Sequence, residues 1–157
     1  MKKLFALFAL AALLCSCGGD FSKKLTIPEV DESQLTEEQK QYRWDVTSAT
    51  LSYFWSDESN INQKDKADGI EVQLSLHASN PIQMPNDMAR SMSRNFKVVL
   101  VGKSSPNLCE MKAIEPMRLQ EFFSGRTTSQ TVSFEYKGSD ILEIYDQAET
   151  FVVGLGF

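Results

Sequence analysis

The sequence is poor in the residues from which most catalytic and metal sites are built. One histidine and three cysteines occur among 157 residues, so a histidine-based triad or a common zinc ligand set has little raw material. Lysine and arginine number 16 against 21 aspartate and glutamate, a formal net charge of −5. This acidic balance disfavours a nucleic-acid partner, which requires a basic surface. We therefore expect no metal, no other cofactor and no enzymatic activity.

The apolar run near the N-terminus is too short for a transmembrane helix. Leu4 to Leu14 contains 11 residues, whereas a membrane-spanning helix needs about 20. The run follows Lys2 and Lys3, which form a short positively charged segment. This arrangement is typical of a signal peptide that is removed from the mature protein.

The end of the apolar run predicts a lipid anchor. Leu14-Cys15-Ser16-Cys17 resembles a bacterial lipobox, with an aliphatic residue three positions before the cysteine and a small residue directly before it. Cys17 is the predicted acceptor, because Cys15 would follow a bulky leucine. An ordinary secretory signal is the alternative. Several acyl chains would hold the protein stably at a membrane. The residue directly after Cys17 is Gly18 and not aspartate, which resembles the pattern of lipoproteins that are sent to the outer membrane.

Cleavage before Cys17 divides the chain into three predicted parts. Residues 1–16 are the signal peptide, residues 17–41 are a flexible tether with a short helix, and residues 42–157 are one globular domain. The tether is polar and contains two glycines and a proline, and Thr36 to Gln39 matches a helical capping box. Removal of residues 1–16 leaves 14 basic and 21 acidic side chains, a net charge of −7. Cys109 then stays as the one unlipidated cysteine, and we expect it to be a buried thiol.

Apolar and polar residues alternate with a period of two over most of the predicted domain. In Ile70 to Ala78, for example, aliphatic residues alternate with glutamate, glutamine, serine and histidine. Such a pattern indicates an antiparallel strand with one face in water. The predicted strands are Val46–Trp55, Ile70–Ala78, Phe96–Val101, Cys109–Ala113, Val132–Tyr136 and Phe151–Phe157.

Two short helices are predicted between these strands. One covers Asn86 to Arg94, and the other covers Met117 to Ser124, between Pro116 as a first helical residue and Gly125 as a stop signal. Ile141 to Tyr145 fits either a strand or a helical turn. Six or seven short strands without βαβ alternation predict an all-β fold. We expect a single antiparallel β-sandwich of immunoglobulin or transthyretin type, with one or two short helices.

Candidate catalytic groups are isolated in the sequence. His77 lies on the polar side of its strand, where a solvated role is the simplest. Glu71 and Glu135 lie on the outward sides of different strands and could approach as a glycosidase pair does, although nothing distinguishes them from surface acids. The loop from Ser56 to Gly69 does not fit a calcium loop, because Lys64 would occupy the first ligand position.

Two segments resemble the outer-membrane lipoprotein family of type VI secretion systems. Ser59 to Asn62, followed by Asp68 to Leu76, forms an asparagine-containing loop with a downstream glycine that leads into an alternating aliphatic strand. Ala148 to Phe157 is similar to the closing strand of that family. The resemblance implies a non-enzymatic, transthyretin-like domain. It would sit on the periplasmic side of the outer membrane and dock an envelope protein partner.

The predicted contact surfaces are the longest connections between strands, because loops carry function on a rigid scaffold. These are Ser56 to Gly69 and Ser79 to Asn95. The candidate partner-binding residues within them are Asn60, Asn62, Asp65, Asp68, Met88 and Arg90.

The alternative function is that of a cell-surface lipoprotein that binds a glycan or another small ligand. Exposed aromatic side chains would then stack against the ligand. Tyr42, Trp44 and Trp55 are the available residues, although packing in the core is the simpler role for Trp55.

Overall fold

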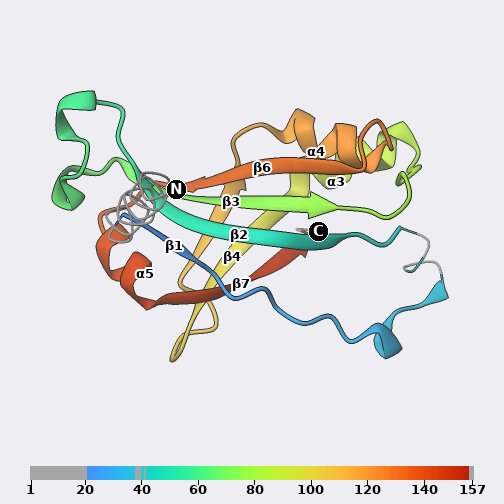
Figure 1. The fold of residues 1–157 in the computed structure, drawn as a ribbon, viewed down its shortest axis with the longest axis horizontal. Helices are drawn as coiled ribbons and strands as arrows, with labels where there is room; N and C mark the ends of the chain where they lie inside the picture. The colour runs from blue at the N-terminus through green and yellow to red at the C-terminus, as the bar shows by residue number, and fades with distance from the viewer. Residues whose placement is uncertain (1–20, 38–39, 41, 156–157) are drawn as a thin grey trace, which may run out of the picture.

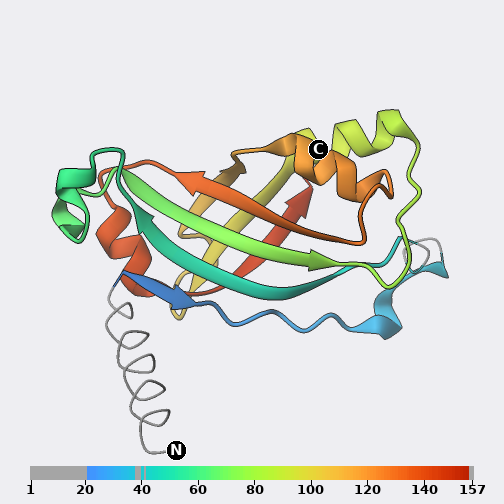
Figure 2. The same cartoon turned by 45° about the horizontal axis from the view of Figure 1, so that its top comes forward.

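The computed structural model describes residues 21–37, 40 and 42–155. These residues form a seven-stranded antiparallel sheet that curls into a half-barrel (Figures 1 and 2), with the strand order β1-β2-β3-β6-β5-β4-β7. The strands are β1 Ser22–Lys24, β2 Asp45–Phe54, β3 Gly69–His77, β4 Phe96–Gly102, β5 Cys109–Ala113, β6 Ser129–Tyr136 and β7 Ala148–Leu155. The helices are α3 Asn86–Asn95, α4 Pro116–Phe123 and α5 Ile141–Gln147, with 3-10 turns η1 Glu32–Gln34, η2 Glu58–Asn60 and η3 Lys64–Lys66.

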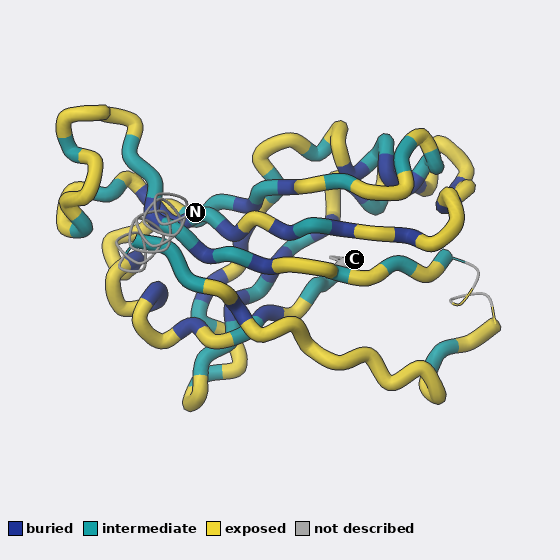
Figure 3. Tube along the Cα trace, viewed as in Figure 1, coloured by how far each residue is buried: buried dark blue, intermediate teal, exposed yellow. Residues whose placement is uncertain are grey.

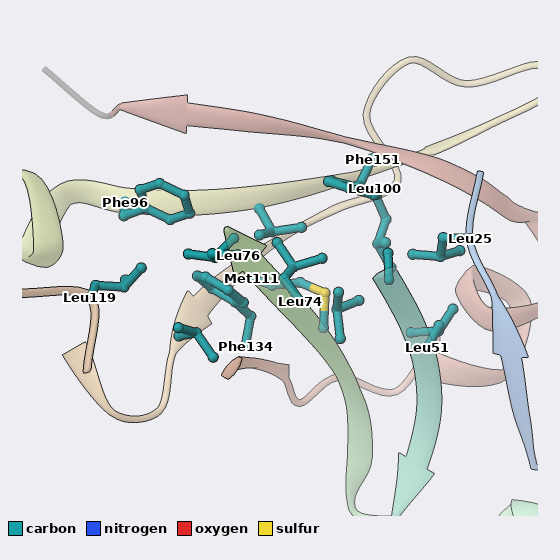
Figure 4. Close-up of a cluster of buried hydrophobic side chains, with 14 of the residues drawn as sticks. Leu25, Leu51, Leu74, Leu76, Phe96, Leu100, Met111, Leu119, Phe134 and Phe151 are labelled. Carbon is teal, nitrogen blue, oxygen red and sulfur yellow. The ribbon is translucent and has the colours of Figure 1, made fainter. Parts of the chain in front are cut away.

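The alternating pattern places the core on the concave face of the sheet. Leu51 on β2, Val72 on β3 and Phe134 on β6 have no exposed surface, and they follow one another across the sheet in register. Buried and more exposed residues alternate along each of these strands (Figure 3). Figure 4 shows the leucine, phenylalanine and methionine side chains that meet inside the curled sheet. The predicted inward faces of these strands are therefore confirmed.

The predicted two-sheet sandwich is wrong, since the described strands belong to a single sheet. A period of two shows that one face of a strand is buried, but it does not show what covers that face. Here short helices cover the concave face in place of a second sheet. α4 buries Leu119, Phe122 and Phe123, and α5 buries Ile141, Ile144 and Tyr145.

The two predicted helices are present, and the ambiguous segment is a third helix, α5. α4 begins with Pro116, and Gly125 follows it with a φ of 77°, a left-handed conformation that glycine adopts easily. The helix predicted from the capping box at Thr36 lies partly outside the described residues, as do Cys17, the signal peptide and the last two residues of the final predicted strand.

The predicted flexible tether is in part a piece of the domain. Ser22–Lys24 pairs with β2 as strand β1, and Leu25 is buried. The chain then crosses to the other edge of the sheet, where the Thr26 N–H donates to the Glu149 carbonyl at 2.9 Å. The Thr150 hydroxyl donates to the Thr26 carbonyl at 2.6 Å. The folded domain therefore begins well before residue 42, because this segment joins the two edges of the half-barrel.

Candidate functional site

The structure places the predicted contact residues at two opposite ends of the molecule (Figures 1 and 2). The loop from Ser56 to Gly69 leaves the end of β2 at Phe54, beside α5, whereas α3 lies near the start of β2. The ten residues of β2 span about 33 Å at 3.3 Å per residue. Asn60, Asn62, Asp65 and Asp68 therefore cannot share one contact surface with Met88 and Arg90.

Several polar residues of this loop are engaged in its own structure. The Asn60 side-chain amide donates to the Asp57 carboxylate at 3.3 Å, and Asn62 has a φ of 72°. The Asp68 carboxylate accepts a hydrogen bond from the Ser56 N–H. Asx turns of this kind need asparagine and aspartate whether or not a partner binds, which explains the loop composition without a ligand.

A mainly apolar opening lies at the other end, between α3 and the N-terminal segment. We call it the methionine groove, and its volume is about 450 Å³, near the lower end of the range for small-molecule sites. The residues that line it are Val30, Leu35, Thr36, Tyr42, Arg43, Trp44, Asp45, Met84, Met88 and Met92. Met88 and Met92 are four residues apart on α3 and so share a face of the helix.

Trp44 forms a wall of the methionine groove and is held by the aromatic core. Its ring centroid lies 5.7 Å from that of Phe96 and 6.1 Å from that of Phe123. These distances are typical of aromatic pairs in cores. Trp44 is half-buried, so one part of the side chain stabilises the end of the half-barrel and another part lines the groove.

An ion-pair cluster joins the two parts of the chain that border the groove. Arg43 Nη1 lies 2.7 Å from Glu32 Oε1, and Arg43 Nη2 lies 3.5 Å from Asp45 Oδ1. The hydrogen bond to Glu32, followed by the charges of Glu32 and Asp45, raises the pKa of Arg43 above its ordinary value. Because the cluster is exposed, solvent screens both ion pairs and each adds little to stability. The cluster joins η1 to the start of β2 at the border of the groove.

A second cavity continues from the methionine groove toward the edge of the sheet. We call it the seam pocket, because it lies where β2 and β7 face each other across the open side of the half-barrel. Its volume is about 370 Å³, and it is lined by Ile27, Pro28, Val30, Arg43, Trp44, Asp45, Val46, Phe151, Val152 and Val153. Four residues, Val30, Arg43, Trp44 and Asp45, line both cavities, so the two openings are neighbours.

The remaining candidate catalytic groups lie on the outer face of the sheet. Glu71 and Glu135 are direct cross-strand neighbours, but Glu135 forms an ion pair with Lys137 at 3.3 Å. His77 Nδ1 lies 3.0 Å from Ser129 Oγ. No group of three or more histidine, cysteine, aspartate or glutamate side chains within the described ranges is arranged to hold a metal ion.

Cys109 is the one cysteine in the described part of the chain, and it is buried, as predicted. Burial, assisted by the charge of Asp140, raises the pKa of the Cys109 thiol to about 12. A thiol with such a pKa is protonated near neutral pH and is a poor nucleophile. Cys109 is therefore a core residue of β5.

The aromatic residues of the alternative prediction have different positions. Tyr42 and Trp44 line the methionine groove, whereas Trp55 packs against Phe21 at a centroid distance of 5.9 Å. The Trp55 indole N–H donates to the Gln63 carbonyl at 2.9 Å. Sequence analysis identified Met88 as a candidate residue but did not identify Val30, Leu35 and Met84. Val30 and Leu35 come close to Met84 only because of the path that the N-terminal segment takes across the domain.

None of the helices that the structure describes is both long and apolar enough to cross a bilayer. Comparison of this chain with family models, with characterised proteins and with solved structures finds no match.

Proposed function

We propose that this protein is a lipid-anchored, non-catalytic binding protein whose half-barrel docks an apolar segment of a protein partner in the methionine groove. The observation that carries the proposal is the groove itself. Met88 is 44% exposed and Val30 is 60% exposed, and both border the same cavity. Large apolar side chains left open around a cavity favour binding over a purely structural role.

Methionine is well suited to contact a protein segment. Its flexible, polarizable side chain adapts to apolar surfaces of different shapes, and apolar grooves of this kind accept side chains spaced along a helix. Three methionines line the groove from one side, while Val30, Leu35 and Tyr42 line it from the N-terminal segment. The groove offers a glycan little aromatic surface for stacking, because much of the Trp44 ring packs against Phe96 and Phe123.

The position of the proposed lipid anchor also favours the methionine groove as the binding surface. Cys17 is four residues from Phe21, a separation of at most about 14 Å in an extended chain. Phe21 contacts Trp55, and its carbonyl accepts from the Tyr53 N–H at the end of β2. Lipidation of Cys17 would therefore hold the loop from Ser56 to Gly69 near the membrane and point the methionine groove away from it.

This orientation favours Met88 and Arg90 over the four loop residues as partner contacts. We place the anchor in the outer membrane, with the domain on the periplasmic side, as the sequence predicts. Docking within a type VI secretion complex is one form of this proposal, and adjacent secretion-sheath genes would support it. Binding of a small ligand on the cell surface is the second candidate, favoured by the volume of the groove and the position of Tyr42.

Site-specific photo-crosslinking in intact cells tests the groove. A photoreactive amino acid is placed at Met88, at Ile61 in the far loop, or at Leu142 on α5, all of which are exposed. We expect a protein adduct of discrete mass from position 88 and none from position 142. The adduct should disappear when Met92 is also changed to glutamate, whereas a change of exposed Met117 to glutamate should leave it intact.

Adducts from position 61 alone would move the partner site to the loop and contradict the proposal. A small molecule that co-purifies with the protein in native mass spectrometry, and that the Met92→Glu change removes, would favour the second candidate.

A further inference from the structure

The last strand of the sheet has a free edge that faces the seam pocket. β7 pairs with β4 along one side. On its other side, the pairing found in the described residues is a single bridge between Thr26 and Thr150. The segment of β7 beyond Thr150 is therefore an open edge, and it borders the seam pocket through Phe151, Val152 and Val153.

The orientation of the backbone on this edge follows from the register. The Leu100 carbonyl accepts from the Leu108 N–H, so the polar backbone groups of Leu100 point away from β7. Residues directly opposite each other in an antiparallel pair face either toward or away from each other. Phe151 lies opposite Leu100, so its backbone groups face the free edge. By alternation, those of Val153 and Leu155 do the same.

This edge lacks the features that usually protect a free strand. Proteins block such edges with charged side chains, proline or a covering element. Residues 151–155 of β7 contain no charged residue and no proline, and Val152 is 53% exposed. A β-carbon added at Gly154 would meet no atom within 4 Å, so the outer face is also open here.

The protein's own N-terminal segment begins to cover this edge and then stops. Thr26 pairs with Thr150 in parallel orientation. If this ladder continued, the residue at position 28 would donate its N–H to the Phe151 carbonyl. That residue is Pro28, which has no N–H to donate. Proline therefore ends the internal pairing and leaves the seam open.

We propose that an extended segment of a partner protein adds to the free edge of β7 as an eighth strand and places aliphatic side chains in the seam pocket. The inference names the form of the partner and so rests on the proposed binding function. Main-chain hydrogen bonds to an exposed edge supply affinity in this mode, and pockets for alternate side chains supply specificity. Trp44, Phe151 and Val153 provide the apolar lining.

The size and charge of the surface favour a partner segment over a second copy of this chain. The free edge of five residues is about 17 Å long, whereas a stable protein interface uses about 20–30 residues from each side. Two copies of a mature chain with net charge −7 would also repel each other. Glu29 and Asp31 are exposed beside the seam, so a segment flanked by lysine or arginine is the best match.

Hydrogen exchange of individual amides, measured by NMR on the protein with a synthetic peptide, tests the proposal. The probe is Ac-KKVTVTVTKK-NH2, and the controls are Ac-EEVTVTVTEE-NH2 and the broken strand Ac-KKVTPTVTKK-NH2. We expect the first peptide to slow exchange at Val153 and Leu155. Val152 should not respond, because its N–H already faces β4 by alternation. The acidic and proline-containing peptides should have much smaller effects.

Two variants separate edge pairing from other binding. Val153→Pro removes one outward N–H and should weaken peptide binding about tenfold, the loss of one hydrogen bond. If that variant does not fold, Val152→Lys places a charge on the exposed edge and should also weaken binding. Ile114→Lys makes a matched change at an exposed position directly after strand β5 and should leave binding unchanged.

Three results would overturn the proposal. The first is the absence of edge protection at millimolar peptide. The second is protection that rises with protein concentration alone, which would indicate a second copy on the edge. The third is binding reported only by the methyl groups of Met88 and Met92, which would contradict strand addition while supporting the methionine groove as a binding site.

Discussion

Replacement of Gly125 by alanine should destabilise the protein and disturb the wall of the methionine groove. Gly125 has a φ of 77°, and an alanine in this left-handed conformation costs about 1–2 kcal/mol. A β-carbon at residue 125 would also lie 2.7 Å from the Ile82 backbone oxygen, and overpacking of this kind adds about 1–3 kcal/mol. We therefore expect the free energy of unfolding to fall by about 2–5 kcal/mol.

Urea unfolding followed by tryptophan fluorescence measures this change. Gly154→Ala is the matched control, because its β-carbon would meet no atom within 4 Å, and we expect its stability to stay within about 0.5 kcal/mol of the parent. Gly125→Asn keeps the steric overlap but tolerates the left-handed conformation better, so it should lie between the two. Equal stabilities for Gly125→Ala and Gly154→Ala would refute the reasoning.

Three further predictions concern the anchor, the core and the sheet closure. Cys17→Ser should abolish metabolic labelling with palmitate while Cys15→Ser retains it, and label that survives in the former would contradict the anchor. Burial raises the pKa of Tyr53 and of Cys109 to about 12, from 10.0 and 9.0. The unfolded chain loses these protons first, so stability should be complete below pH 9 and fall between about pH 9 and 12. The urea midpoint of Cys109→Ala should fall less across this pH range than that of the parent protein. If the midpoints of Cys109→Ala and Tyr53→Phe both fall as much as that of the parent, these two groups do not cause the pH dependence. Thr150→Val removes the hydroxyl that donates to the N-terminal segment and should lower the unfolding free energy by about 1 kcal/mol, with faster proteolysis of that segment.

Local patterns predicted the main strands and helices, because their causes lie within a few residues. The alternation in β3 is set by which side chains face the core, and α4 is bounded by Pro116 and by the glycine that follows it. α5 could also have been assigned. Ile141, Ile144 and Tyr145 are spaced as one face of a helix, whereas a strand would have placed Glu143 on the buried side.

The curvature of the sheet and the candidate site could not be predicted from local sequence patterns. Thr26 and Thr150 are 124 positions apart, and no local signal indicates that they meet. The composition of residues 17–34 is that of a linker, yet the pairing of β1, the burial of Leu25 and the Thr26 bridge hold this segment against the sheet. Both cavities depend on the Thr26–Thr150 contact, because Val30 lines them only after the chain has crossed the seam there.

The N-terminal segment connects the proposed anchor to both proposed binding surfaces. From Phe21 it pairs with β2, then bridges to β7 at Thr26, and then borders the seam pocket through Ile27 and Pro28. A strand that extends along β7 would meet this segment at the Thr26 bridge. If partner binding strengthens or weakens the Thr26 bridge, the bridge must strengthen or weaken partner binding by the same free energy, because coupling between two equilibria is reciprocal. The affinity for the proposed partner strand should therefore depend on how firmly β1 and Thr26 hold the sheet closed.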